Sequence, residues 1–216
     1  MHADTPRDLP DKIEALAGRI EALPNNRDRL LIAIAGPPGS GKSTLAEAVV
    51  AELVARGHDA VMMPMDGFHL DNRLLQDRGL RARKGAPETF DFGGFHAALE
   101  RVRKQPSVIL PVFDRTRDIA IAGAVEIRAA TRIVVVEGNY LCLDEEPWRR
   151  LGPLWDLSVY LDVPIDELKK RLVARWLAHG FGEQAAVEKA GSNDLPNAVR
   201  TSEAVIPVDL VMSSKA

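Results

Sequence analysis

Eight residues in the first quarter of the chain have the spacing of a phosphate-binding loop. They are Gly36-Pro37-Pro38-Gly39-Ser40-Gly41-Lys42-Ser43, which match the pattern G-x-x-x-x-G-K-S. Glycines in such a loop let the backbone turn tightly, so that successive N–H groups face phosphate oxygens. The lysine reaches the β- and γ-phosphates, and the serine hydroxyl can bind Mg²⁺. We therefore predict that this loop and the following Thr44 bind ATP together with Mg²⁺.

The segments on either side of the loop fit this prediction. Residues 30–35 form an apolar run typical of a strand buried on both faces. Residues 44–53 combine strong helix formers with helical spacing of apolar residues, and Gly57 then ends the predicted helix. A strand, a glycine-rich loop and a helix N-terminus in this order form an anion site. The alternative, a flexible Gly/Pro turn, is disfavoured by these neighbours.

Two other predicted strands also end in polar residues. Residues 60–65 lead into Asp66-Gly67-Phe68-His69, and residues 133–136 lead into Glu137-Gly138-Asn139-Tyr140. Strands alternate with helices over most of the chain, which predicts an α/β fold with a doubly wound, mostly parallel sheet and helices on both faces. Ligands of such sheets bind at the carboxyl ends of the strands. We therefore expect these segments and the loop to meet at one edge.

The carboxylates at this edge could take part in phosphoryl transfer. Asp66 could accept the proton of an attacking hydroxyl, orient Mg²⁺ or water, or cap the helix that follows. Glu137 could orient Mg²⁺ together with Ser43, or simply emerge at a surface. His69 could donate a hydrogen bond to a substrate, although a histidine beside aromatic residues is often structural.

Charged segments further along could form the pocket of the phosphate acceptor. Residues 81–91 are rich in charge, and Pro87 makes the segment rigid. Arg83 or Lys84 could therefore stabilise negative charge that develops during the reaction. The alternative is a solvated loop. After a predicted strand at 108–113, three more charged residues follow. Asp114 could accept hydrogen bonds from a polyol or sugar, and Arg115 or Arg117 could pair with phosphate. A turn containing salt bridges is the alternative.

Two arginines lie four residues apart on a predicted helix that begins at Pro164 and ends near His179. Arg171 and Arg175 share one face of that helix and could close over the triphosphate, stabilising charge in the transition state. If that face points outward, they are surface charges. Residues 193–197 could contact the nucleotide base or cap a short helix.

Other patterns predict the elements that surround the site. An amphipathic helix at about residues 9–23 is expected to pack on the core as an accessory element outside the active site. The remaining predicted elements are helices at 70–81 and 94–104, a hairpin at 119–128, and strands at 157–161 and 204–212.

Composition limits the possible functions. The 216 residues are 46% hydrophobic, which suits one domain (1–216) with a lid at about 165–195. The net charge of −3 gives no footprint for nucleic acid. No apolar run is long enough for a membrane span, no signal peptide is visible, and the single cysteine excludes an internal disulfide. We expect a cytoplasmic protein with a small-molecule partner, and a homodimer is possible.

The combination of these motifs resembles the superfamily of uridine kinase, phosphoribulokinase and bacterial pantothenate kinase. The resemblance rests on Asp66-Gly67-Phe68-His69, Glu137-Gly138 and the segment 83–91 behind the loop, and it spans about residues 30–212. Within this superfamily the sequence is most similar to bacterial proteins named as fructose-transport-system kinases. The resemblance implies ATP and Mg²⁺, catalysis by Asp66, and a lid carrying Arg171 and Arg175. It implies phosphorylation of a sugar such as fructose, with uridine or pantothenate as alternatives.

A regulatory P-loop NTPase that acts as a switch is a different reading of the same loop. Switch GTPases carry an N-K-x-D element and transport ATPases an L-S-G-G-Q-type signature, and the chain has neither. The polar segments between residues 66 and 117 favour a kinase, because a switch needs no acceptor pocket.

Overall fold

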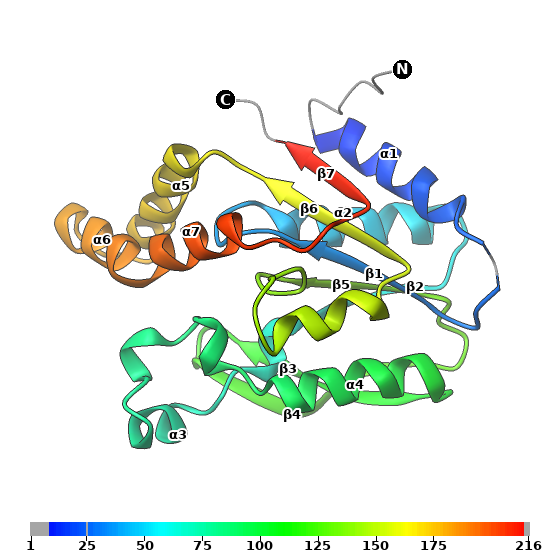
Figure 1. The fold of residues 1–216 in the computed structure, drawn as a ribbon, viewed down its shortest axis with the longest axis horizontal. Helices are drawn as coiled ribbons and strands as arrows, with labels where there is room; N and C mark the ends of the chain where they lie inside the picture. Colours follow the sequence, from blue (N-terminus) through cyan, green and yellow to red (C-terminus); the bar gives the residue numbers. More distant parts are fainter. Residues whose placement is uncertain (1–8, 25, 214–216) are drawn as a thin grey trace.

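A five-stranded parallel sheet forms the centre of the computed structural model, which describes residues 9–24 and 26–213 (Figure 1). The strand order is β2-β5-β1-β6-β7. The strands are β1 (Leu30–Ala35), β2 (Ala60–Pro64), β5 (Ile133–Gly138), β6 (Leu157–Asp162) and β7 (Leu210–Ser213). β1, β5 and β6 are almost wholly buried, in agreement with their continuous apolar sequences.

Helices cover both faces of this sheet, which confirms the predicted doubly wound α/β fold. On one face, α1 (Leu9–Glu21) and α2 (Lys42–Ala55) bury leucine, isoleucine and valine side chains against β1 and β6. On the other face, α4 (Phe92–Lys104) packs with an aromatic group that includes Tyr140 and Trp148 (Figure 1). The accessory helix expected at 9–23 is therefore present as α1.

A separate two-stranded antiparallel sheet packs beside α4. It consists of β3 (Val108–Asp114) and β4 (Ile119–Ile127). The prediction of a hairpin within 119–128 was wrong, because this whole segment is one strand that pairs with β3. The residue that suggested a turn, Gly123, has φ 69° and lies opposite the stretch in which the pairing register shifts, between Leu110 and Val112.

Helices dominate the C-terminal quarter of the chain. α5 (Ile165–Ala178) was predicted, and α6 (Glu183–Lys189) and a π-helical turn (Ala190–Asp194) lie within the range 165–195 predicted as a helical lid, whereas α7 (Leu195–Glu203) was not predicted. The strand expected at 204–212 is reduced to β7. The helix expected at 70–81 is reduced to α3 (Asn72–Asp77), because Gly79 with φ 67° stops it. Within the described ranges, no helix has the length and apolar character of a membrane span.

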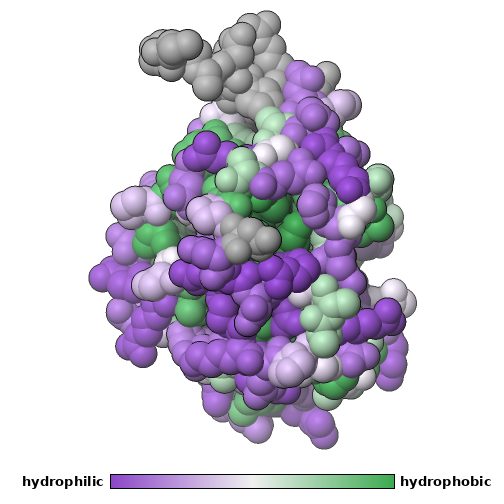
Figure 2. All heavy atoms as spheres, turned by 90° about the vertical axis from the view of Figure 1, so that its right-hand side faces the viewer, coloured by the Kyte–Doolittle hydropathy of each residue, from purple (hydrophilic) through white to green (hydrophobic). Residues whose placement is uncertain are grey.

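The strand register brings the polar strand ends to one edge of the sheet. Ile34 of β1 and Pro64 of β2 both pair with Glu137 of β5. The phosphate-binding loop, Asp66 and Glu137 therefore leave the sheet side by side, as expected from parallel strands. The face at the opposite, amino edge of the strands is mostly hydrophilic (Figure 2).

A buried arginine connects several backbone segments at the amino edge of the sheet. The guanidinium of Arg29 is 4% exposed and donates hydrogen bonds to five backbone carbonyls. These carbonyls belong to Val102, Gln105, Pro106, Arg128 and Thr131.

We expect Arg29→Met to lower the free energy of unfolding by about 3–5 kcal/mol, because buried carbonyls lose their donors. Thermal and urea unfolding measure this loss. Arg128→Met is the matched control, since it removes the same type of side chain from an exposed position in the same corner. An Arg29→Met protein as stable as the control would contradict the assigned role.

Candidate functional site

The phosphate-binding loop connects β1 to the first turn of α2. Gly41, the residue before the helix, has φ 89°, a conformation that favours glycine and directs the first N–H groups of α2 toward the loop. The Oγ atom of Ser40 is buried in the loop without a hydrogen-bond partner among the described residues. A buried hydroxyl without a partner next to free helix N–H groups fits a phosphate group.

Lys42, Ser43 and Glu137 form a polar cluster at the base of the loop. The hydroxyl of Ser43 donates to Oε2 of Glu137 at 3.1 Å. Burial raises the pKa of the Glu137 carboxyl, and the nearby charge of Lys42 opposes that rise. Burial also lowers the pKa of Lys42, opposed by Glu137 and Asp66. The charged groups of Lys42, Glu137 and Asp66 are thus close enough to interact through a poorly hydrated space.

Ser43 and Glu137 are suitable ligands for Mg²⁺. Their oxygens are the hard donors that this ion prefers, and Mg²⁺ usually binds one or two protein groups while water and phosphates complete its shell. The described part of the chain contains no cluster of three or more His, Cys, Asp or Glu residues that could hold a metal. A two-ligand site shared with phosphate oxygens is consistent with that finding.

Asp66 lies in a 3₁₀ turn (Met65–Phe68) that follows β2. Its Oδ2 pairs with the guanidinium of Arg115 at 2.8 Å. The capping role considered for Asp66 is performed by Asp71, whose side chain accepts from the N–H of Arg73 at the start of α3. Asp66 is therefore free of a helix-capping bond and is held at the edge by an exposed arginine.

Gly138 brings the turn that carries Asp66 against β5. A Cβ atom at Gly138 would lie 2.6 Å from the Cβ of Met65, in the same turn as Asp66. The absence of a side chain at this glycine therefore allows two protein segments to pack closely, which places Asp66 near Glu137.

His69 stacks between two aromatic rings. Its ring centroid lies 4.0 Å from that of Phe90 and 4.4 Å from that of Phe113. Its Nδ1 donates to the backbone carbonyl of Asp66 at 2.7 Å, and burial lowers its pKa. His69 thus positions the turn of Asp66, and the predicted contact to substrate would use its Nε2.

The segment 81–91 contacts α3 and the turn between β3 and β4. The ammonium of Lys84 lies 2.8 Å from Oδ1 of Asp118 and 2.7 Å from Oδ1 of Asn72. Lys84 therefore anchors this segment to the turn between β3 and β4. Arg83 is less constrained, with one carboxylate oxygen of Glu88 at 3.6 Å.

The turn after β3 separates its three predicted site residues. Asp114 accepts a hydrogen bond from the backbone N–H of Arg117 at 3.0 Å, so its carboxylate shapes the turn. Arg115 reaches Asp66, and Arg117 is exposed. The structure thus contains the salt bridge considered as an alternative, and it involves the edge carboxylate itself.

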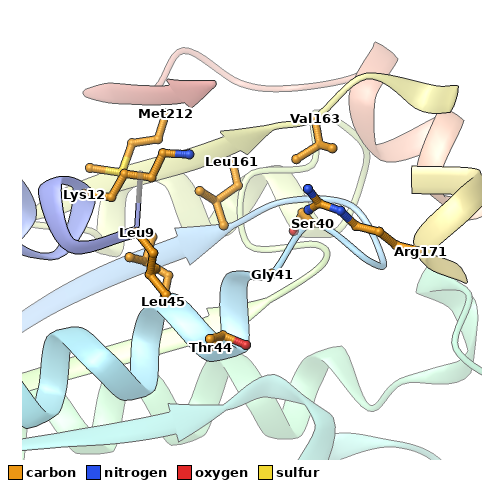
Figure 3. A pocket seen from close by; sticks show the side chains of 10 residues that line it. All are labelled: Leu9, Lys12, Ser40, Gly41, Thr44, Leu45, Leu161, Val163, Arg171 and Met212. Carbon is orange, nitrogen blue, oxygen red and sulfur yellow. The ribbon is translucent and has the colours of Figure 1, made fainter. Parts of the chain in front are cut away.

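α5 brings Arg171 and Arg175 to the other side of the loop. Arg171 lies beside Ser40 and Gly41 (Figure 3). Its Nε pairs with Glu167 at 2.8 Å. Arg175 pairs with Asp194 at 2.8 Å, and its charge lowers the pKa of Lys42. Asp194 also accepts from the indole of Trp176, so the π-helical turn holds this end of α5.

Sequence reasoning missed the residues that hold the segment 81–91 in place. The hydroxyl of Tyr140 donates to the carbonyl of Gly85, and the side-chain amide of Asn193 donates to the carbonyl of Lys84 at 2.8 Å. Tyr140 directly follows Glu137-Gly138-Asn139 at a strand end, and this position was the available signal. Asn193 lies in the segment 193–197, which was considered for a contact to the nucleotide base or for a helix cap, and this bond to Lys84 was not foreseen.

A pocket of about 290 Å³ adjoins the phosphate-binding loop (Figure 3). The loop, α2, the end of β6, α5 and β7 contribute to its walls, and so does the first turn of α1. The lining residues are Leu9, Lys12, Ser40, Gly41, Thr44, Leu45, Leu161, Val163, Arg171 and Met212. α1 thus lines this pocket in addition to packing on the core.

Comparison with known proteins places these features in a family. Residues 31–181 match the model of the "Phosphoribulokinase / Uridine kinase family". The crystal structure of a "putative fructose transport system kinase" from Silicibacter sp. TM1040 is 51% identical, covers 92% of this chain and 98% of its own, and has a TM-score of 0.89.

Curated relatives support the same assignment. The uncharacterized protein YggC of Escherichia coli (strain K12) is 35% identical over 82% of this chain and 74% of its own length. A "putative uridine kinase" of Schizosaccharomyces pombe is 31% identical over 95% of this chain and 92% of its own. The chain thus belongs to the phosphoribulokinase/uridine kinase family and is a P-loop small-molecule phosphotransferase.

Proposed function

We propose that the protein transfers the γ-phosphoryl group of ATP to a hydroxyl of a small metabolite, with Mg²⁺ as cofactor. One observation carries the proposal. The strand register brings the carboxylates of Asp66 and Glu137 to the same edge of the sheet as the phosphate-binding loop. Phosphoryl transfer needs these groups together, because the acceptor must lie between a proton acceptor and the terminal phosphate.

In this proposal each side chain has a separate task. Mg²⁺, when bound, would supply positive charge that offsets the charge of the phosphates. Ser43 and Glu137 would hold the ion, and Lys42 would contact the terminal phosphates. Asp66 accepts the proton of the acceptor hydroxyl; its partner Arg115 keeps the carboxylate oriented and can move aside, because the arginine is 67% exposed.

The helices between about residues 165 and 195 act as the lid in this proposal. Arg171 already lies against the loop. Arg175 pairs with Asp194 and is near enough to Lys42 for the two positive charges to interact. Closure of α5 and the π-helical turn would bring both guanidiniums to the triphosphate. Exclusion of water by this movement would favour transfer to the acceptor over hydrolysis.

A sugar such as fructose is our first candidate for the acceptor. The relative that is 51% identical is named for a fructose transport system. The charged groups of Arg83, Asp114, Arg115 and Arg117, which lie on the segments flanking Asp66, suit hydroxyl-rich or phosphorylated molecules. Uridine and pantothenate are the alternatives, because other members of the family act on them.

ADP release with Mg-ATP and a panel of acceptors tests the proposed function. The panel begins with fructose, other ketohexoses, uridine and pantothenate. We expect one acceptor class to raise ADP release at least about tenfold above the rate without acceptor, and the phosphorylated product to form in equal amount. Nucleotide hydrolysis that no acceptor in a broad panel stimulates would instead favour a regulatory NTPase.

A further inference from the structure

We propose that α1 forms part of the nucleotide site and that Lys12 binds the nucleoside half of the phosphoryl donor. This inference rests on the proposed function, because it assumes that a nucleoside triphosphate occupies the phosphate-binding loop. α1 ends at Glu21, before the residues 31–181 that match the family model. The contact would thus come from an element outside the part of the chain that this model describes.

The pocket has the position and chemistry of a nucleoside site. It includes Ser40 and Gly41 of the loop, Thr44 of α2 and Met212 of β7. It therefore lies on the β6 and β7 side of β1, whereas Asp66 follows β2 on the other side. Its volume of about 290 Å³ is at the lower end of the range for small-molecule pockets, about 300–1,000 Å³. A triphosphate held by the loop would therefore have its nucleoside in this pocket.

Half of the residues that line the pocket are apolar. Leu9, Leu45, Leu161, Val163 and Met212 supply branched or flexible hydrophobic side chains. Such surfaces suit the faces of a planar base, whereas its ring nitrogens and the ribose hydroxyls need polar partners at the rim. Lys12 is the polar lining residue that α1 contributes, outside the loop and α2.

Lys12 is available for such a contact. Among the residues that the structure describes, no side chain forms a hydrogen bond or ion pair with its ammonium, although acidic residues lie on the same helix. Figure 3 shows its side chain extending from α1 toward the pocket, with Leu9 on the same helix turn packed near Leu45. An ammonium can donate three hydrogen bonds, which suits base nitrogens and ribose oxygens.

α1 is fixed relative to the loop, so that Lys12 has a defined position. Leu16, Ala17 and Ile20 of α1 are buried in the same core cluster as α2. Arg56, just after α2, pairs with Glu14 and Glu21 of α1. Because α2 begins at the loop, these contacts hold the first turn of α1 at a constant distance from the phosphate site.

The test compares two ligands that share the phosphate groups and differ in the nucleoside. Isothermal titration calorimetry would measure the Kd of Mg-ATP and of Mg-tripolyphosphate for each variant. Lys12→Met keeps the aliphatic stem and removes the donor. Arg19→Met is the matched control, because it removes one positive charge from an exposed position on the same helix.

We expect Lys12→Met to weaken Mg-ATP binding by about 10–100-fold, the loss typical of one hydrogen bond from a charged group. Binding of Mg-tripolyphosphate should be unchanged, and Arg19→Met should bind both ligands like the wild type. Equal weakening of both ligands in Lys12→Met, or unchanged ATP binding, would overturn the inference. Failure of the wild-type protein to bind either ligand would instead overturn the proposed function, and this inference with it.

Discussion

Lys42→Ala is expected to reduce kcat/KM by about 10³-fold or more and to weaken ATP binding by about 10–100-fold. The ammonium of Lys42 lies in the poorly hydrated space shared by Glu137 and Asp66. There its attraction to phosphate oxygens is stronger than at a hydrated surface. Its loss would also raise the pKa of Glu137 further, because Lys42 is the largest opposing charge. A protonated Glu137 would be a poor ligand for Mg²⁺.

Competition with a fluorescent ATP analogue measures the affinity, and coupled ADP release measures the rate. Lys104→Ala is the control, since this exposed lysine of α4 pairs only weakly with Glu100 at 3.7 Å. Thermal unfolding of both variants verifies that the fold is kept. ATP affinity equal to that of the wild type in Lys42→Ala would contradict the assignment of the phosphate-binding loop.

The segments that meet at the carboxyl edge of the sheet could be predicted from sequence, because a few local rules determine their positions. A glycine-rich loop after a buried strand has one common conformation, and parallel strands place their carboxyl ends together. The apolar runs 30–35 and 133–136 identified two neighbouring strands, and their register confirms that Gly36 and Glu137 leave the same edge. The family resemblance rested on the same strand ends, and the comparisons confirm it.

The missed features depend on contacts between distant segments. β4 is one strand because β3 pairs with it, although Gly123 alone suggests a turn. Residues 190–194 resemble a turn, yet Asp194 holds Arg175 and Trp176 and continues the helix as a π-helical turn. Such turns within helices are often found at functional sites.

The pocket beside the loop shows the same limitation. The amphipathic pattern of α1 identifies Leu16 and Ile20 as core residues, and the structure buries both. That pattern does not identify Lys12 or Leu9 as pocket residues. A side chain at the end of a helix lines a pocket only if other elements of the fold lie opposite it. Here β7 and the end of β6 lie opposite, and both come from the second half of the chain.

Asp66→Asn is expected to lower kcat by about 10²–10⁴-fold while ATP binding is kept. The amide has the shape of the carboxylate but cannot accept the proton of the acceptor. Transition states of phosphoryl transfer are loose, so part of the loss would come from poorer positioning of the hydroxyl. The fold should survive, because the partner left unpaired, Arg115, has a side chain that is 67% exposed.

Asp77→Asn is the matched control, as it makes the same change at an exposed position on α3. The Mg²⁺ dependence of the residual rate separates the two remaining roles of Asp66. A proton acceptor leaves the Mg²⁺ concentration for half-maximal rate unchanged, whereas a metal-orienting group raises it. Turnover at the wild-type rate in Asp66→Asn would remove this residue from the chemistry, and the edge carboxylates would then be reduced to Glu137 alone.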